Sequence, residues 1–206
     1  MPRIGKVFGL IAILAAMGGL SSPAAGALIE FTMTGVMEFG NGSDVPPWDD
    51  SMVGEAFEVR FRYDDATPGA FLFVDVVEEL TVTIGDVSET TNTGTIRLRS
   101  GVTASDGLVS DQFSLGGAPL PSGHFAGIVM NRTYDPRVSE SLFSDGTLPS
   151  SLSVGDFMSP RFTLVAPVAG QLNGEILSIT SREVPTPSTL ALLIGGCLFA
   201  HRRRKK

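Results

Sequence analysis

The sequence predicts an all-β domain with an antiparallel β-sandwich or jelly-roll-like fold, flanked by an N-terminal signal helix and a short C-terminal membrane helix. Three observations support the central fold. Short runs alternate between apolar and polar residues, turn-forming residues separate these runs, and no central stretch carries a sustained helical stripe. The flanking helices are expected from apolar segments at the two ends of the chain.

The clearest predicted strand spans residues 56–63, where Phe57, Val59, Phe61 and Tyr63 alternate with charged residues. A period of two places the apolar side chains on one face of a sheet and the charged ones on the other. Residues 80–84 repeat the pattern. Further strands are expected at 28–36, 71–76, 94–99, 108–115, 124–133, 161–165 and 175–180. Turn signals lie between them at 40–43, 64–69, 105–107 and 144–146.

Residues 1–27 have the order of a signal peptide. Arg3 and Lys6 precede the apolar stretch 7–20, and the small residues around Ala25 and Ala27 follow it. Signal peptidase accepts small residues before the bond it cuts, so cleavage is expected after Ala27, give or take a residue or two. The alternative is a retained anchor, but the apolar stretch is shorter than the roughly 20 residues that span a membrane.

The last 23 positions, 184–206, combine a proline-rich segment, the apolar segment 190–200 and the basic tail 202–206. Prolines impose an extended backbone that a protease can bind. The apolar segment is short for a stable span, and the cationic end is retained on the cytoplasmic side. The tail is therefore expected to form a stop-transfer helix whose N-terminus lies outside the membrane. The alternative is an ordinary single-span anchor that is never processed.

This tail resembles the PEP-CTERM sorting signal of Gram-negative bacteria, which membrane protease-transpeptidases called exosortases recognise. In that family the motif is Val-Pro-Glu-Pro-Ser-Thr, followed by an apolar segment and an arginine cluster. Thr186 stands here where the family usually has glutamate. The resemblance implies an exosortase-type partner, and it assigns the sorting motif to Val184, Pro185, Thr186, Pro187, Ser188 and Thr189 and the membrane stop to Arg202, Arg203 and Arg204.

The exported domain, residues 28–183, is strongly acidic. It contains all 22 acidic residues of the chain against eight arginines, a net charge near −14. Such a field repels phosphates, so nucleic acid is excluded as a partner. The chain's one cysteine, Cys197, lies in the apolar tail, where it is expected to be a small apolar filler; acylation or transpeptidation there is the alternative.

Candidate catalytic and metal residues are few, and no cofactor is expected. His124 is the one histidine of the central domain, and no Gly-x-Ser-x-Gly sequence exists to present a nucleophile, so we expect a loop or strand-edge histidine. Cys and His are too few for a structural zinc site. The acidic pairs Asp49-Asp50, Asp64-Asp65 and Glu78-Glu79 offer oxygen ligands for calcium, but no EF-hand spacing is present, and solvated loop tips are expected.

Trp48 and Phe39 lie near Pro46-Pro47, where a carbohydrate-stacking loop is one interpretation. We expect instead that Trp48 anchors the loop to the core. The sequence therefore predicts an exported, non-catalytic surface or matrix protein with a structural or adhesive role. It is processed by signal peptidase and held at least transiently in the inner membrane by its C-terminal helix. A module that binds extracellular polysaccharide or calcium is the alternative, and an envelope enzyme is the third hypothesis.

Overall fold

The computed structural model describes residues 27–42, 45–67, 71–103 and 107–185. Within these ranges the chain forms one antiparallel sheet of ten strands in the order β3-β6-β7-β8-β9-β10-β1-β2-β4-β5, with two short 3-10 helices, η1 and η2. The strands and helices are β1 (Leu28–Asn41), η1 (Asp50–Met52), β2 (Ala56–Asp64), β3 (Leu72–Phe73), β4 (Glu79–Ile84), β5 (Val87–Thr91), β6 (Thr95–Thr103), β7 (Val109–Pro119), β8 (Phe125–Tyr134), η2 (Val154–Asp156), β9 (Met158–Val165) and β10 (Gln171–Val184).

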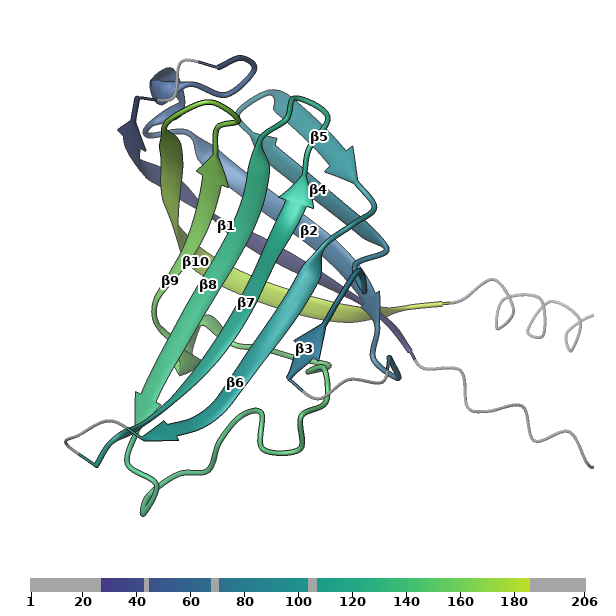
Figure 1. Ribbon diagram of the computed structural model, residues 1–206, viewed down its shortest axis with the longest axis vertical. Helices are drawn as coiled ribbons and strands as arrows, with labels where there is room; N and C mark the ends of the chain where they lie inside the picture. Colours follow the sequence, from purple (N-terminus) through teal and green to yellow (C-terminus); the bar gives the residue numbers. More distant parts are fainter. Residues whose placement is uncertain (1–26, 43–44, 68–70, 104–106, 186–206) are drawn as a thin grey trace, which may run out of the picture.

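The sheet curls so that its two halves face each other. Strands β6 to β9 form one layer, and β10, β1, β2, β4 and β5 form the other (Figure 1). Aromatic pairs join the layers: the rings of Phe57 in β2 and Phe162 in β9 have centroids 5.0 Å apart, and Phe61 in β2 lies 6.2 Å from Phe113 in β7. The apolar core is therefore the space between the two halves of one sheet.

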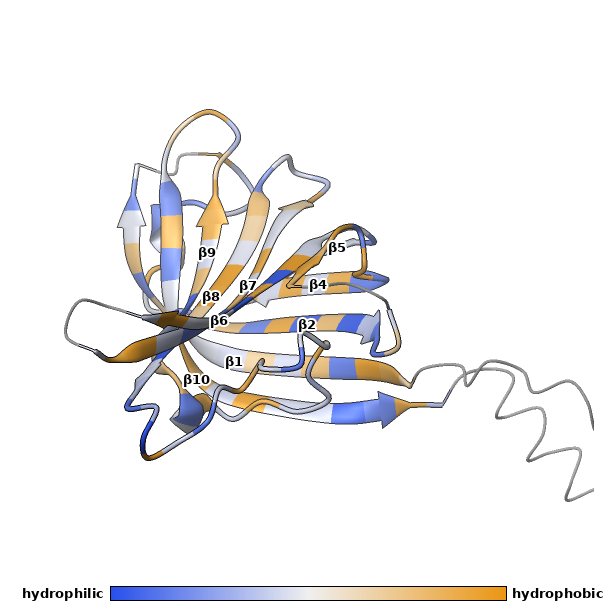
Figure 2. Ribbon diagram, turned by 60° about the horizontal axis from the view of Figure 1, so that its bottom comes forward, coloured by the Kyte–Doolittle hydropathy of each residue, from blue (hydrophilic) through white to orange (hydrophobic). Residues whose placement is uncertain are grey.

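The predicted period of two is realised along the strands. In β2 the four predicted apolar residues are buried, while the charged residues between them are only partly buried. In β1, Ile29, Phe31 and Met33 face the core. Figure 2 shows the resulting alternation of hydrophobic and hydrophilic bands along the ribbons. Burying one face of each strand drives the folding of the curled sheet.

The all-β, antiparallel prediction is confirmed, and each of the predicted strands has a counterpart. The two facing halves are sandwich-like, but they belong to one continuous sheet, whereas a jelly roll packs two sheets. Consecutive strands mostly pair with each other, because short connections favour neighbouring antiparallel strands.

Two elements differ from the expectation. The strand predicted at 71–76 shrinks to β3, because Phe71 and Asp75 adopt left-handed backbone conformations, with φ of 69° and 52°. Strand β5 was not predicted. It reads Val-Ser-Glu-Thr-Thr, has no buried residue, and pairs along one side with β4 at the edge of the sheet, so it lacks the apolar alternation that marks a half-buried strand.

Both predicted flanking helices lie outside the described residues. Among the residues that the structure does describe, no helix is long and apolar enough to cross a membrane.

A long connection, residues 135–157 between β8 and β9, closes the end of the core at the bottom of Figure 1. It contributes the buried side chains of Phe143 and Leu148 to the core cluster. The hydroxyl of Tyr63 donates a hydrogen bond to the carbonyl of Pro149. The connection is therefore attached to the sheet by apolar and polar contacts.

Candidate functional site

The two ends of the β-domain lie next to each other. β1 begins at Leu28, β10 ends at Val184, and these two residues are paired in the antiparallel register. Figures 1 and 2 both show the start of β1 and the end of β10 side by side at one end of the domain. The residue that follows the predicted signal-peptide boundary and the first residue of the predicted sorting motif therefore lie side by side, although they are far apart in the sequence.

The residues around this place are held by specific contacts. The backbone N–H of Ala27 donates to Asp65 Oδ1 at 2.7 Å, and the carbonyl of Ala27 accepts from the backbone N–H of Asp65 at 3.1 Å. Val184 is the last residue of β10 and Pro185 follows it, exposed. The other predicted motif residues, the membrane-stop arginines and Ala25 lie outside the described part of the chain: Ala25, Thr186, Pro187, Ser188, Thr189, Arg202, Arg203 and Arg204.

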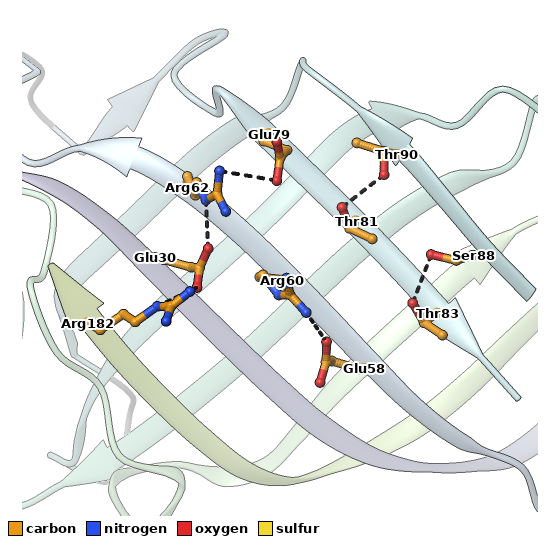
Figure 3. A network of polar contacts seen from close by, with 10 residues as sticks. All are labelled: Glu30, Glu58, Arg60, Arg62, Glu79, Thr81, Thr83, Ser88, Thr90 and Arg182. Atoms are coloured by element: carbon orange, nitrogen blue, oxygen red, sulfur yellow. Dashed lines mark hydrogen bonds and ion pairs between the residues drawn. The ribbon is translucent and has the colours of Figure 1, made fainter. Parts of the chain in front are cut away.

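A charged network crosses the outer face of the sheet near the same end. Glu30 in β1 lies between Arg62 in β2 and Arg182 in β10 (Figure 3). Arg62 Nε lies 2.6 Å from Glu30 Oε2, and Arg182 Nε lies 2.7 Å from Glu30 Oε1. Arg62 also approaches Glu79 Oε1 at 3.4 Å. Each residue is directly opposite its partner on the next strand, so the network is a cross-strand row.

Glu30 is 2% exposed although it points outward, because the two arginine side chains cover it. Burial alone raises the pKa of its carboxyl. The hydrogen bonds from Arg62 and Arg182 and their positive charges outweigh burial, so the pKa of Glu30 lies below its ordinary value of 4.5. The carboxylate therefore stays ionised and links the two strands next to β1.

Further polar pairs continue across this face. Thr81 and Thr90, Thr83 and Ser88, and Thr34 and Ser178 are hydroxyl pairs at 2.8–2.9 Å. A shallow depression of about 420 Å³ lies among them, lined by Thr34, Gly35, Ala56, Phe57, Glu58, Thr83, Gly85 and Leu177. Hydroxyl and carboxylate groups on an open, shallow surface are able to hydrogen-bond a polar ligand.

His124 lies immediately before β8, in keeping with the predicted loop or strand-edge position, but its side chain is fully buried. Its Nδ1 is 2.9 Å from Ser122 Oγ, which in turn lies 2.8 Å from Glu89 Oε2 in β5. The backbone N–H of Ser122 donates to the same Glu89 oxygen at 3.1 Å. This chain of contacts connects the turn between β7 and β8 to the edge strand β5.

The order of these groups differs from that of a Ser-His-Asp triad. Glu89 contacts the serine and not the histidine, so the Ser122 hydroxyl proton is directed to the carboxylate and His124 Nδ1 donates to the hydroxyl oxygen. Burial lowers the pKa of His124, outweighing the charge of Glu89 and a backbone hydrogen bond with Trp48. The arrangement holds a neutral histidine in the core.

Residues of two of the three acidic pairs accept local hydrogen bonds in turns. Asp49 accepts from the backbone N–H of Ser51 at the start of η1, and Asp50 accepts from Gly42. Asp64 accepts from the backbone of Ala66 in the turn after β2. Across the described ranges, no group of three or more Asp, Glu, His or Cys side chains is placed to hold a metal ion.

Trp48 is fully buried, and its ring lies edge-on to that of His124 with centroids 5.6 Å apart. Its loop is thus anchored to the core, as the sequence predicts. The ring has no exposed face on which a sugar can stack. Phe39, by contrast, is 53% exposed on β1.

Sequence reasoning missed Asp111, which is fully buried in β7. It accepts hydrogen bonds from Ser141 Oγ at 2.9 Å, from the backbone N–H of Leu142 at 2.7 Å and from that of Gly101 at 3.1 Å. The signal was present, because Asp111 occupies an inward position in a run with Val109, Phe113 and Leu115. A carboxylate in that position requires hydrogen-bond donors from elsewhere in the fold.

Comparison with known proteins adds no relative. No family model, no curated protein and no solved structure matches this chain.

Proposed function

We propose that this chain is an exported protein of the cell surface or extracellular matrix, sorted by its PEP-CTERM-like tail, with a structural or adhesive and non-catalytic role. Signal peptidase removes the N-terminal segment. The C-terminal helix holds the protein in the inner membrane until an exosortase-type protease acts on the motif that begins at Val184.

The observation that carries this proposal is the pairing of Leu28 with Val184. Each predicted processing point lies just outside the strand next to it, so cutting at both points leaves β1 and β10 and their shared ladder complete. The points where both predicted membrane segments join the domain also lie at one end of it, which suits a protein held at a membrane surface by its ends.

The face that bears the network of Figure 3 supports a structural or adhesive role. Its strands are joined by the Glu30 row and by hydroxyl pairs. Cross-strand pairs of this kind each stabilise a sheet by a fraction of a kcal/mol, on the order of 0.2–1. The acidic domain carries no disulfide, so these contacts and the core must maintain it outside the cell.

The proposal is tested by the intact mass of the protein from the envelope and the medium of the producing cell. We expect a chain that starts near Leu28 and ends near Pro187, with or without an added group. A chain that keeps residues 190–206 would show that the tail is a permanent anchor, and a chain that keeps residues 1–26 would contradict export by this route.

A pair of variants shows whether the motif is responsible. Replacing Pro185 and Pro187 by alanine is expected to leave the tail attached, because the extended backbone is lost. Pro136→Ala, at an exposed position of the 135–157 connection, is the control and is expected to leave processing unchanged. Equal processing of both variants would contradict recognition of this motif.

A second candidate function is binding of extracellular polysaccharide, favoured by the depression beside Thr34, Glu58 and Thr83. Isolated exopolysaccharide is expected to raise the melting temperature if this surface binds it. Thr83→Ala, which removes a lining hydroxyl, is expected to reduce that rise. Thr90→Ala on β5, away from the depression, is the matched control. An unchanged melting temperature of the wild-type protein would contradict this function.

A further inference from the structure

Ala27 belongs to the folded domain. It is partly buried and packs against the core cluster. Its carbonyl and its N–H both bond to Asp65, as described above, which extends the contact between β1 and β2 by one residue beyond the Leu28–Asp64 pair. Removal of Ala27 together with the signal peptide would eliminate both of these hydrogen bonds.

The carboxylate of Asp65 is placed to form an ion pair with a positive charge on the nitrogen of Ala27. It is half-buried and accepts the Ala27 N–H at 2.7 Å, a short distance for such a bond. Among the described residues it forms no ion pair with an arginine. The carboxylate of the neighbouring Asp64 accepts a hydrogen bond from the backbone N–H of Ala66 in the turn.

From these contacts we infer that signal peptidase cuts the Gly26–Ala27 bond, and that the α-ammonium group of Ala27 then forms an ion pair with Asp65. The inference rests on the proposed export. Water adds across the peptide bond, so that Gly26 leaves with a carboxylate and Ala27 receives the amine, which takes up a proton at neutral pH. Cleavage here requires small residues at the third and first positions before the bond, and Ala24 and Gly26 meet this requirement.

Maturation by this cut changes one contact. A neutral N–H donor to the Asp65 carboxylate is replaced by a charged donor on the same nitrogen, and charge-assisted hydrogen bonds are the stronger kind. Cleavage one residue later satisfies the peptidase equally well, with Ala25 and Ala27 before the bond, but it leaves Asp65 without its partner. The fold therefore distinguishes two cleavage sites that the sequence pattern treats alike.

The first experiment is N-terminal sequencing of the protein exported from cells that express the full chain. A start at Ala27 is the expected result. A start at Leu28 or at any other position after residue 20 would overturn the inference and leave export intact. A chain that begins at the initiator end, residue 1 or 2, would contradict the proposed export itself.

The second experiment tests the ion pair. The three lysines of the chain, Lys6, Lys205 and Lys206, all lie in the terminal segments, so an amine-acylating reagent modifies within the β-domain only its N-terminal amine. Acylation is expected to lower the melting temperature of the exported protein by about 2–4 °C. In Asp65→Asn the same treatment is expected to change it little.

Asp64→Asn is the matched control, since it alters the adjacent carboxylate, which accepts its hydrogen bond from the backbone of Ala66. Acylation should lower the melting temperature of this variant as much as that of the wild type. An equal effect of acylation in Asp65→Asn and in the wild type would overturn the ion pair, whatever the N-terminal sequence.

Discussion

Glu30 and Arg182 are separated by 152 residues in the chain, yet Arg182 Nε lies 2.7 Å from Glu30 Oε1. The contact joins the first strand of the domain to its last strand, and Arg62 binds the other carboxylate oxygen from β2. Because Glu30 is buried by its partners, its loss leaves two arginines without their shared anion.

Glu30→Gln is expected to lower the free energy of unfolding by about 1–3 kcal/mol, since hydrogen bonds to charged groups contribute in that range and both arginines retain access to water. Chemical denaturation measures this. Glu58→Gln is the matched control. The side chains of Arg60 and Glu58 in this ion pair are 41% and 40% exposed. Because exposed ion pairs contribute little to stability, a change in the free energy of unfolding below about 0.5 kcal/mol is expected. Equal effects would contradict the role of the row.

The Glu30 contribution also depends on pH. The folded-state pKa lies below the ordinary value of 4.5, so the stabilisation is fully present above that value and is lost as pH falls through the lower folded pKa. The difference in stability between wild type and Glu30→Gln is therefore expected to be constant at neutral pH and to shrink in strongly acidic solution. A difference that grows on acidification would contradict this.

His124 is expected to make the fold sensitive to mild acid. Its pKa in the folded state is lowered from 6.5, so below that pH the unfolded chain takes up protons more readily than the folded one, and stability falls as pH decreases. Denaturation curves between pH 7.5 and 5 measure this loss. His124→Asn, which keeps a donor toward Ser122, is expected to remove this dependence. The same slope in the variant and the wild type would assign the effect to other groups.

Asp111→Ala is expected to destabilise the protein by about 2–4 kcal/mol, because it leaves two backbone N–H groups and the Ser141 hydroxyl without their acceptor. The 135–157 connection should then become more accessible to protease. Asp156→Ala removes an exposed acid at the end of the same connection and is expected to stay within about 0.5 kcal/mol of wild type. Unchanged proteolysis in Asp111→Ala would show that the connection is held by its apolar contacts.

Gly35→Ala tests the close approach of β1 to its neighbours. An added Cβ would lie 1.8 Å from the carbonyl oxygen of Glu175 and 2.6 Å from the ring of Phe57, so the strands must separate. A loss of more than about 2 kcal/mol is expected, within the usual range of overpacking. Gly116→Ala is the control, since an added Cβ there meets no atom within 4 Å. Similar stability of both variants would mean that β1 shifts freely.

Apolar alternation and turn residues in the sequence were sufficient to predict an antiparallel all-β domain and most of its strands. The pattern of residues 56–63 was sufficient to predict β2 and which of its faces is buried, because a strand's side chains alternate whatever its neighbours are. The order of basic, apolar and small residues at the N-terminus predicts the signal peptide, and the sorting motif is what the resemblance of the tail to PEP-CTERM signals implies. Apolar alternation missed β5, whose pairing with β4 at an edge needs no apolar face.

Only the tertiary structure decided which distant residues meet. The curl of the sheet pairs Leu28 with Val184, places Arg182 on Glu30, and brings Ser122 and His124 to Glu89. Local periodicity specifies the face on which a side chain lies but not the strand beside it, because strand order depends on the combined burial of all ten strands. For that reason the contact between Ala27 and Asp65, on which the proposed cleavage site rests, required the fold.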